Sequence, residues 1–489
     1  MKASTKMRLG VTGAVLTALG WRLYFIRQFP FLDAGDTPIY QQLARNWLKH
    51  GIYGLKLGGR ILPVDMRAPG YPAFLAAIYA VFGESWRAVM LAQAGMDVLT
   101  CVLAAGIAAV LAPQASRSRV ALAALWLGAV CPFTANYTAV VLTETLATFL
   151  TALALLVLVE AVRDENGVNV LQAQRAGEVA RASAPAGGEM RAAMPWLLGG
   201  IVAGFGTLVR PETPLVLAGA GVVLVFLWRR PANWKKLARA ASWMALGLIL
   251  PLLPWGARNW RVLHEAQFLA PRYGEMPGEY VPKGFYSWEK TWLWRFGDVF
   301  TVSWNLDGGE IHVKDLPASA FDSAAEKARV ERLLAAYNRT QTMTPEVDRQ
   351  FAEIARERTA RDPLRTYLKI PVFRALTMWF TPRIEMLPLS GKLWPIGKWW
   401  EDDETQYCDS LALFLAGIAY AALALAGAWK CRKNPAAMVL VAFIVIRTAF
   451  LTTIETPEPR YVLECFPAVF ALAAQVWAKR REAPQGERI

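Results

Sequence analysis

Long apolar runs recur along the whole chain, and they restrict its possible folds more than any other feature. Such runs, of about 17–25 residues, have the length that a helix needs to cross a hydrocarbon core of roughly 30 Å. Hydrophobic residues make up 55% of the 489 residues, which is too apolar for a soluble protein with charged surfaces. We therefore predict an all-α polytopic membrane protein of about ten transmembrane helices, at residues 9–26, 87–111, 120–137, 139–162, 194–209, 214–228, 240–257, 409–429, 436–453 and 461–477.

Basic residues gather at alternate ends of these predicted helices, and this alternation indicates their orientation. Clusters before the first helix, near residues 117–119 and 229–239, and at 479–481 all fall on one side. By the positive-inside rule, that side and both termini are cytoplasmic. The net charge of +14 then suits lipid headgroups better than nucleic acid. We expect an integral protein of the bacterial inner membrane whose active site is extracytoplasmic.

The predicted helices divide the chain into three blocks. Residues 1–261 form an N-terminal transmembrane module, whose first outer loop, 27–86, contains an amphipathic juxtamembrane segment at 38–49. Residues 262–407 form a mostly helical extracytoplasmic insert, and residues 408–489 form a three-helix C-terminal module. Basic and aromatic residues at 366–380 predict a helix lying in the membrane interface. The polar, Ala- and Gly-rich segment 163–191 predicts a mobile loop.

Carboxylates and arginines gather on the predicted outer face, where lipid would make them costly. Asp33 and Asp36 follow the first predicted helix, and Glu144 lies inside the fourth. Ionisable groups in such places mark function by default. Guanidinium groups match phosphate oxygens, and a carboxylate can act as a base toward a hydroxyl. The further outer-face candidates are Arg67, Arg210, Glu212, Arg447 and Arg460.

Each candidate also has a structural interpretation. Glu144 could be a packed, hydrogen-bonded glutamate, and Arg210 with Glu212 could form a capped turn. Arg447 could pair with Glu464 instead of binding phosphate. Two other charged residues are expected to be structural: Arg22 as a side chain that snorkels to the interface, and Asp97 as a hydrogen-bond partner between helices.

Six short motifs lie on the predicted outer face: residues 36–40 (DTPIY, ending in Tyr40), 43–44 (LA), 50–53 (HGIY), 67–75 (RAPGYPAFL), 143–146 (TETL) and 458–461 (EPRY). Together they resemble the GT-C class of integral-membrane glycosyltransferases, in the branch of protein O-mannosyltransferases and bacterial aminoarabinose transferases. Many relatives have Asp-Glu at the first motif, where this chain has Asp36 and Thr37, so the choice of base between Asp33 and Asp36 stays open.

The resemblance implies transfer of a sugar, with inversion, from a polyprenyl-phosphate donor to an acceptor hydroxyl. Asp36 would be the base, and Asp33 and Glu144 would orient the acceptor or tune Asp36. Donor phosphate or sugar would be bound by Arg67, Arg210, Arg460, Arg447, Tyr40 and Glu212.

The sequence leaves cofactor, partners and some alternative functions open. No metal-ligand cluster or Gly-rich phosphate loop is evident, so no cofactor is expected, although a divalent cation at Asp33 or Asp36 stays open. The expected partners are membrane lipids, a lipid-linked sugar donor, and a hydroxyl acceptor on a protein, a glycan or a glycolipid. A lipid-linked sugar flippase or transporter, a polymer ligase using a diphosphate-linked donor, and a non-catalytic assembly factor are the alternatives.

Overall fold

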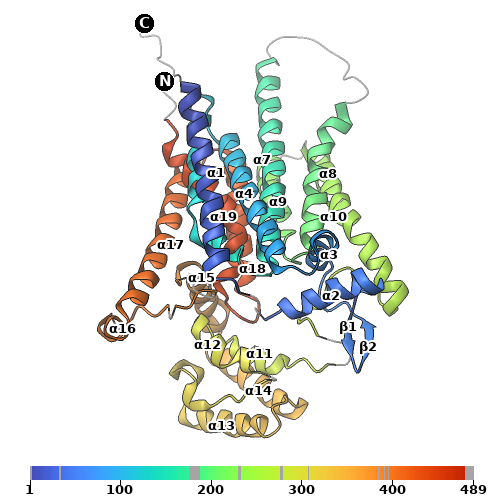
Figure 1. Ribbon diagram of the computed structural model, residues 1–489, viewed down its shortest axis with the longest axis vertical. Helices are drawn as coiled ribbons and strands as arrows, with labels where there is room; N and C mark the ends of the chain where they lie inside the picture. Colours follow the sequence, from blue (N-terminus) through green and yellow to red (C-terminus); the bar gives the residue numbers. More distant parts are fainter. Residues whose placement is uncertain are drawn as a thin grey trace. The chain divides into compact units, whose positions relative to one another are not determined.

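The computed structural model describes residues 3–31, 35–175, 188–229, 233–275, 279–306, 308–382, 386–389, 391–394 and 396–479. Helices dominate these residues, and their contacts divide the chain into two compact units (Figure 1). The first unit comprises Met1–Ala270, Ile384–Ile446 and Leu463–Ile489, and the second comprises Pro271–Arg383 and Arg447–Val462. These units follow packing, whereas the three predicted blocks follow membrane topology, so the block boundaries stay a prediction.

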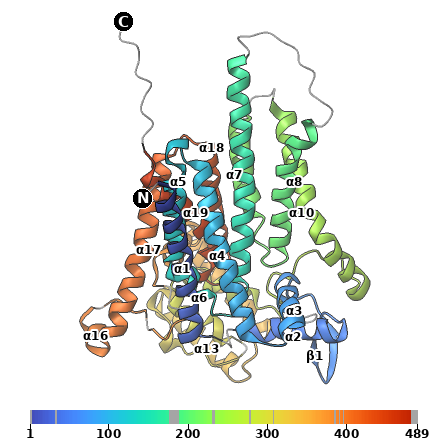
Figure 2. The same cartoon turned by 45° about the horizontal axis from the view of Figure 1, so that its top comes forward.

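Apolar helices of the first unit confirm the polytopic helical fold. Among the described residues, five helices are long and apolar enough to cross a membrane: α1 (Ala3–Gln28), α4 (Trp86–Leu111), α7 (Glu144–Arg175), α10 (Trp234–Leu263) and α17 (Glu404–Lys430). Four shorter helices also contain apolar runs: α3 (Gly70–Phe82), α8 (Gly188–Thr207), α9 (Leu215–Leu227) and α18 (Pro435–Leu451). Figure 2 shows α7 standing beside α4 and α8.

Close packing of α8 against α10 depends on glycine. A Cβ atom at Gly200 would lie 2.3 Å from the Met244 carbonyl oxygen, and one at Gly247 would lie 2.3 Å from that of Leu197. Small residues allow helix backbones to approach in this way inside membranes. The two helices therefore form a single tightly joined wall of the first unit.

The first outer loop folds into two helices and a hairpin. The predicted amphipathic segment is helix α2 (Thr37–His50), which Gly51 ends in the left-handed conformation with φ of 68°. Strands β1 (Gly54–Leu57) and β2 (Arg60–Pro63) then pair antiparallel around Gly58 and Gly59, which both have positive φ. The sequence analysis did not predict this hairpin. Helix α3 follows and completes the loop.

Several predicted helix boundaries are wrong. Helix α7 begins at Glu144, so this residue opens the helix instead of lying one and a half turns inside it. The same helix continues to Arg175 through part of the predicted loop, whose remainder at 176–187 lies outside the described residues. The predicted span 120–137 breaks into α5 (Arg117–Ala129) and α6 (Pro132–Tyr137). The last span is a mixed helix: Pro459–Cys465 and Ala474–Trp477 are 3-10 segments flanking α19 (Phe466–Ala473).

The second unit is helical around an aromatic core. Trp288, Trp292 and Phe351 are all buried in it, and Trp288 lies 5.0 Å from Phe351 between ring centroids. Its helices are α11 (Lys283–Glu289), α12 (Phe296–Thr301), α13 (Ala324–Asn338), α14 (Pro345–Arg361) and α15 (Ile370–Phe380). A π-helical turn at Arg365–Lys369 leads into α15. The short helix α16 (Ile396–Asp402) precedes α17 in the first unit.

Candidate active site

Asp36 and Arg67 form an ion pair at the start of the first outer loop. Asp36 is the N-cap residue of α2, and Arg67 lies three residues before α3. The Arg67 Nη2 atom donates to Asp36 Oδ1 at 2.8 Å, and the Asp36 side chain is 39% exposed. The carboxylate is thus held from one side by a guanidinium while remaining accessible to a small hydroxyl. The other predicted acid, Asp33, lies outside the described residues.

Tyr40 connects this pair to a second charged group. It lies one turn after Asp36 on α2, is buried, and packs edge-to-face on Tyr71 of α3 at 5.2 Å between ring centroids. Burial, followed by the charge of Asp36, raises the pKa of Tyr40, and Arg67, Glu144 and Arg210 also act on it electrostatically. The phenol therefore stays protonated, and it lies within electrostatic range of two carboxylates and two guanidinium groups.

Arg210 is the centre of the second charged group. It follows α8, and its guanidinium pairs with Glu144 at 3.2 Å, with Glu212 at 2.9 Å and with Glu464 at 3.3 Å. The four side chains are at least four-fifths buried. Glu144 lies at the N-terminus of α7, where the helix dipole stabilises a negative charge. Thr151, two turns along α7, donates to the other Glu464 carboxylate oxygen at 3.1 Å.

Glu464 is a site residue that the sequence analysis named only as a pairing partner for Arg447. It lies in the 3-10 segment before α19, far along the chain from Arg210. Its only local signal was a carboxylate inside an apolar run, which by default marks function in a membrane protein. Three carboxylates therefore surround one guanidinium in this part of the first unit.

Arg447 and Arg460 belong to the second unit, so their predicted convergence with Asp36 stays a prediction. Arg460 pairs with Glu458 at 2.6 Å, and its guanidinium lies 5.5 Å from the ring centroid of Tyr461. Arg447 is fully buried and donates to the Tyr461 carbonyl oxygen at 3.4 and 3.3 Å.

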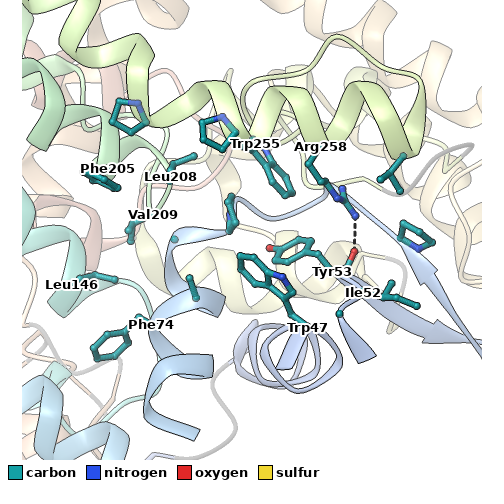
Figure 3. A pocket seen from close by; sticks show the side chains of 18 of the residues that line it. Trp47, Ile52, Tyr53, Phe74, Leu146, Phe205, Leu208, Val209, Trp255 and Arg258 are labelled. Carbon is teal, nitrogen blue, oxygen red and sulfur yellow. Dashed lines mark hydrogen bonds between the residues drawn. The ribbon is translucent and has the colours of Figure 1, made fainter. Parts of the chain in front are cut away.

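The first unit contains an apolar cavity of about 690 Å³, whose lining side chains are drawn in Figure 3. Its lining adjoins the charged residues in sequence: Val209 precedes Arg210, and Leu146 lies two residues after Glu144. Tyr53, also in the lining, donates its hydroxyl to the Arg67 carbonyl oxygen at 2.8 Å. Rings and aliphatic side chains supply most of the wall, from Trp47, Phe74, Leu150, Phe205, Leu208 and Trp255.

One arginine also reaches this cavity, but its guanidinium is already bonded. Arg258 on α10 donates to the carbonyl oxygens of Tyr53 at 2.7 Å and Val64 at 2.9 Å, and Figure 3 shows it pointing at Tyr53. Its guanidinium also lies over the ring of Trp255 at 5.1 Å. The cavity therefore presents an almost entirely apolar surface to a ligand.

Within the part of the chain that the structure describes, no three or more His, Cys, Asp or Glu residues are arranged to hold a metal ion. The possible cation at Asp33 or Asp36 stays untested, because Asp33 is outside that part.

Comparison with known proteins gives a fold. No family model and no curated protein matches the sequence. The oligosaccharyltransferase of Archaeoglobus fulgidus, tethered to an acceptor peptide with the NVT sequon, is similar with a TM-score of 0.51 at 14% identity, over 96% of this chain and 49% of that one. ArnT from Cupriavidus metallidurans, bound to undecaprenyl phosphate, is similar with a TM-score of 0.37 at 14% identity, over 97% of this chain and 78% of that one.

This chain therefore spans about half the length of the archaeal oligosaccharyltransferase. The likeness to that protein shows a fold shared with GT-C glycosyltransferases, as the sequence motifs predicted.

Proposed function

We propose that this protein is an inverting glycosyltransferase that moves a sugar from a polyprenyl-phosphate donor to an acceptor hydroxyl on the extracytoplasmic face of the bacterial inner membrane. One observation carries the proposal. An accessible carboxylate held by an arginine, Asp36 with Arg67, lies within electrostatic range of Tyr40, and so does the Arg210 group, and an apolar cavity is lined by sequence neighbours of these residues. A base, cationic groups for phosphate and a place for a lipid chain are the three requirements of this reaction.

In the proposed reaction, Asp36 takes the proton of the acceptor hydroxyl as its oxygen attacks the anomeric carbon. The new C–O bond forms as the bond to the phosphate oxygen breaks, and the electron pair leaves with the lipid phosphate. Attack opposite the leaving group inverts the anomeric centre. Asp36 suits the role of general base because Arg67 donates to its Oδ1 atom and its side chain is partly exposed.

The leaving group needs positive charge more than a proton. A phosphate monoester has a second pKa of about 6, so it leaves as an anion near neutral pH. Arg67 and Arg210 supply two guanidinium groups that both act electrostatically on Tyr40, and Tyr40 adds a hydroxyl donor. Glu144, Glu212 and Glu464 hold Arg210 in place. Arg447 and Arg460 are proposed as further donor-binding residues.

The apolar cavity is proposed to hold the first isoprene units of the donor. Its volume of about 690 Å³ lies within the range of roughly 300–1,000 Å³ that is usual for small-molecule sites. The guanidinium of Arg258 already donates to two backbone carbonyl oxygens, so the cavity suits a hydrocarbon chain. The donor phosphate is then proposed to bind Arg67 and Arg210.

The test uses the purified full chain in lipid nanodiscs with polyprenyl-phosphate sugars, measuring release of lipid phosphate in the presence of an acceptor mixture from membranes. Asp36→Asn should lower the release rate at least about 100-fold, because general-base catalysis contributes 10²–10⁴-fold. Glu84→Gln is the matched control, since Glu84 is a surface carboxylate that pairs with Arg45 and Lys49 near the same loop. We propose that no metal is required, so EDTA should leave the rate unchanged.

Three results would overturn the proposal. Sugar-lipid movement across a bilayer without bond cleavage would identify a transporter. Preference for diphosphate-linked over monophosphate-linked donors, in direct competition, would identify a polymer ligase. Full activity of a folded Asp36→Asn variant would remove Asp36 from catalysis.

A further inference from the structure

Helix α15 and the turn before it carry an exposed apolar stripe. Leu364, Leu368, Val372, Leu376 and Phe380 follow one another at intervals of four residues, which places them along one side of a helix. Each of these side chains is between 37% and 55% exposed. Such a continuous exposed apolar surface marks a site that something apolar covers.

The opposite side of α15 fixes its rotation. Arg374 is almost fully buried and donates to the carbonyl oxygens of Leu293 at 2.7 Å and Ile454 at 2.6 Å, among others. Burial, which outweighs the neighbouring carboxylates, lowers the pKa of Arg374 to about 10, so its guanidinium is charged at neutral pH. Met378, fully buried, packs against Leu451 and Val462. The stripe therefore faces outward because the inner face is bonded in place.

These contacts attach α15 to the end of an apolar helix. The last residues of α18 belong to the same unit as α15, and Trp379 donates from Nε1 to Thr448 Oγ1 at 3.0 Å there. The 17 residues of α18 extend about 25 Å, close to the roughly 30 Å of a hydrocarbon core. Its side chains Val445 and Phe450 are themselves 59% and 42% exposed. Helix α15 is therefore bonded to the last turn of an apolar helix.

Aromatic and basic residues flank the stripe as they do at membrane interfaces. Trp294 packs on Phe373 of α15 at 5.3 Å between ring centroids, and the Arg295 guanidinium lies over the Trp294 ring at 4.7 Å. Tyr367 is 73% exposed, and Lys369 pairs with Asp362 at 3.2 Å. Tryptophan and tyrosine concentrate at the headgroup level of bilayers.

We propose that the stripe on α15 is a membrane-docking surface, whose occupant is the lipid bilayer at the headgroup–acyl boundary of the leaflet in which α18 ends. Helices with one apolar face and aromatic flanks bury that face about 5–10 Å into this boundary. The continuity with α18 favours lipid over a second protein chain. The inference is independent of the catalytic proposal, because none of its residues belongs to the candidate active site.

The test is fluorescence quenching on the full chain in nanodiscs with or without lipids brominated on their acyl chains. The accessible Cys408 and Cys431 are first changed to Ser, since the other three cysteines are buried. An environment-sensitive label is then placed at Leu368→Cys or Leu376→Cys, with Glu357→Cys, at a position on α14 whose side chain is 56% exposed, as the control. Brominated lipid should quench the stripe labels about twofold more than the control label, given the expected insertion depth.

Equal quenching at the stripe and control positions would overturn the proposal. A second result would also overturn it: stripe labels that escape lipid quenching while energy transfer between differently labelled copies is high would assign the surface to a second copy of this chain. A functional readout separates membrane docking from the proposed catalytic function, because Leu376→Cys should leave lipid-phosphate release unchanged.

Discussion

The backbone N–H of Gly70 donates to the carbonyl oxygen of Leu208 at 2.7 Å, joining the start of α3 to the end of α8. A Cβ atom at Gly70 would lie 2.6 Å from that oxygen. Arg67 stands three residues before this contact and Arg210 stands two residues after it. The spacing of the two guanidinium groups is thus set by a backbone contact that only glycine permits.

Gly70→Ala should therefore separate the two arginines and destabilise the protein. Relief of the clash would shift α3, at a cost of about 1–3 kcal/mol, which is usual for overpacking. We expect lipid-phosphate release to fall even at temperatures where the variant is folded. Thermal unfolding and the release assay measure the two effects.

Gly95→Ala is the control for that substitution. Gly95 lies in α4, and a Cβ atom there would have no neighbour within 4 Å. Replacing a helical glycine by alanine should be neutral or stabilise by roughly 0.5–1 kcal/mol. Equal losses in both variants would mean that the contact with Leu208 is not responsible.

Arg210→Lys should keep the fold and lose most of the activity. Lysine keeps a positive charge among Glu144, Glu212 and Glu464, but it lacks the planar fork that matches phosphate. We expect release to fall about 100-fold in kcat, as for loss of one donor to a developing anion. Glu464→Gln should lower the kcat of lipid-phosphate release about tenfold, since a hydrogen bond to a charged group contributes at least ~1.5 kcal/mol.

Arg329→Lys is the matched control, because Arg329 also bridges two glutamates, Glu353 and Glu357, but on the exposed surface of the second unit. It should leave both kcat and KM unchanged. An Arg210→Lys variant that changes only the thermal stability would give Arg210 a structural role alone.

Filling the apolar cavity should discriminate among donors by chain length. Leu150→Trp adds a ring to the cavity wall six residues after Glu144 on α7. We expect KM for a long-chain donor to rise about tenfold, or ~1.4 kcal/mol, with no rise for a donor too short to reach that wall. Val222→Trp, at a position 55% exposed on α9, is the control. A rise for short and long donors alike would contradict chain binding there.

The second unit should lose stability as pH rises, through Glu289. Burial raises the pKa of this carboxyl from 4.5 to about 8, against the opposing hydrogen bond from Ser303 and the charge of Arg374. The folded state therefore binds more protons than the unfolded state between pH 4.5 and 8. The contribution is fully present below pH 4.5 and is lost as pH rises through about 8.

Hydrogen exchange of the α11 amides as a function of pH, corrected for intrinsic exchange, measures this change. Glu289→Gln should flatten the profile, whereas Glu310→Gln, at a site 52% exposed, should not. A slope that survives in Glu289→Gln would assign the titration to another group.

Hydropathy, together with proline and glycine residues that mark helix ends, predicted much of the architecture. The apolar runs located the long apolar helices, and Pro38 with Gly51 bounded α2 within one residue or two. The β-hairpin was missed although Gly58 and Gly59 stand between two short apolar segments, because strands of four residues give too little period to detect.

Pairings across the chain were not predictable from local pattern. Thr151 and Glu464 meet although 313 residues separate them. Arg22, which was expected to snorkel, is instead fully buried and paired with Asp97 at 2.6 Å, so that expectation was wrong. The expectation that Asp97 is a hydrogen-bond partner between helices is confirmed. Hydropathy shows that a helix is apolar, but not which of its sides faces another helix, and that side decides whether a charge is buried with a partner.

Arg258 joins α10 to the ends of the hairpin, because it donates to the carbonyl oxygens of Tyr53 and Val64. Helix α10 also packs closely on α8 through glycines. On another side of the cavity, Trp47 and Ala73 also border a second apolar groove between α2 and α3. If the donor carries a polyprenyl chain, as we propose, its hydrocarbon tail is expected to enter along this side. The lateral gate of the site is accordingly expected to be the α2–α3 pair.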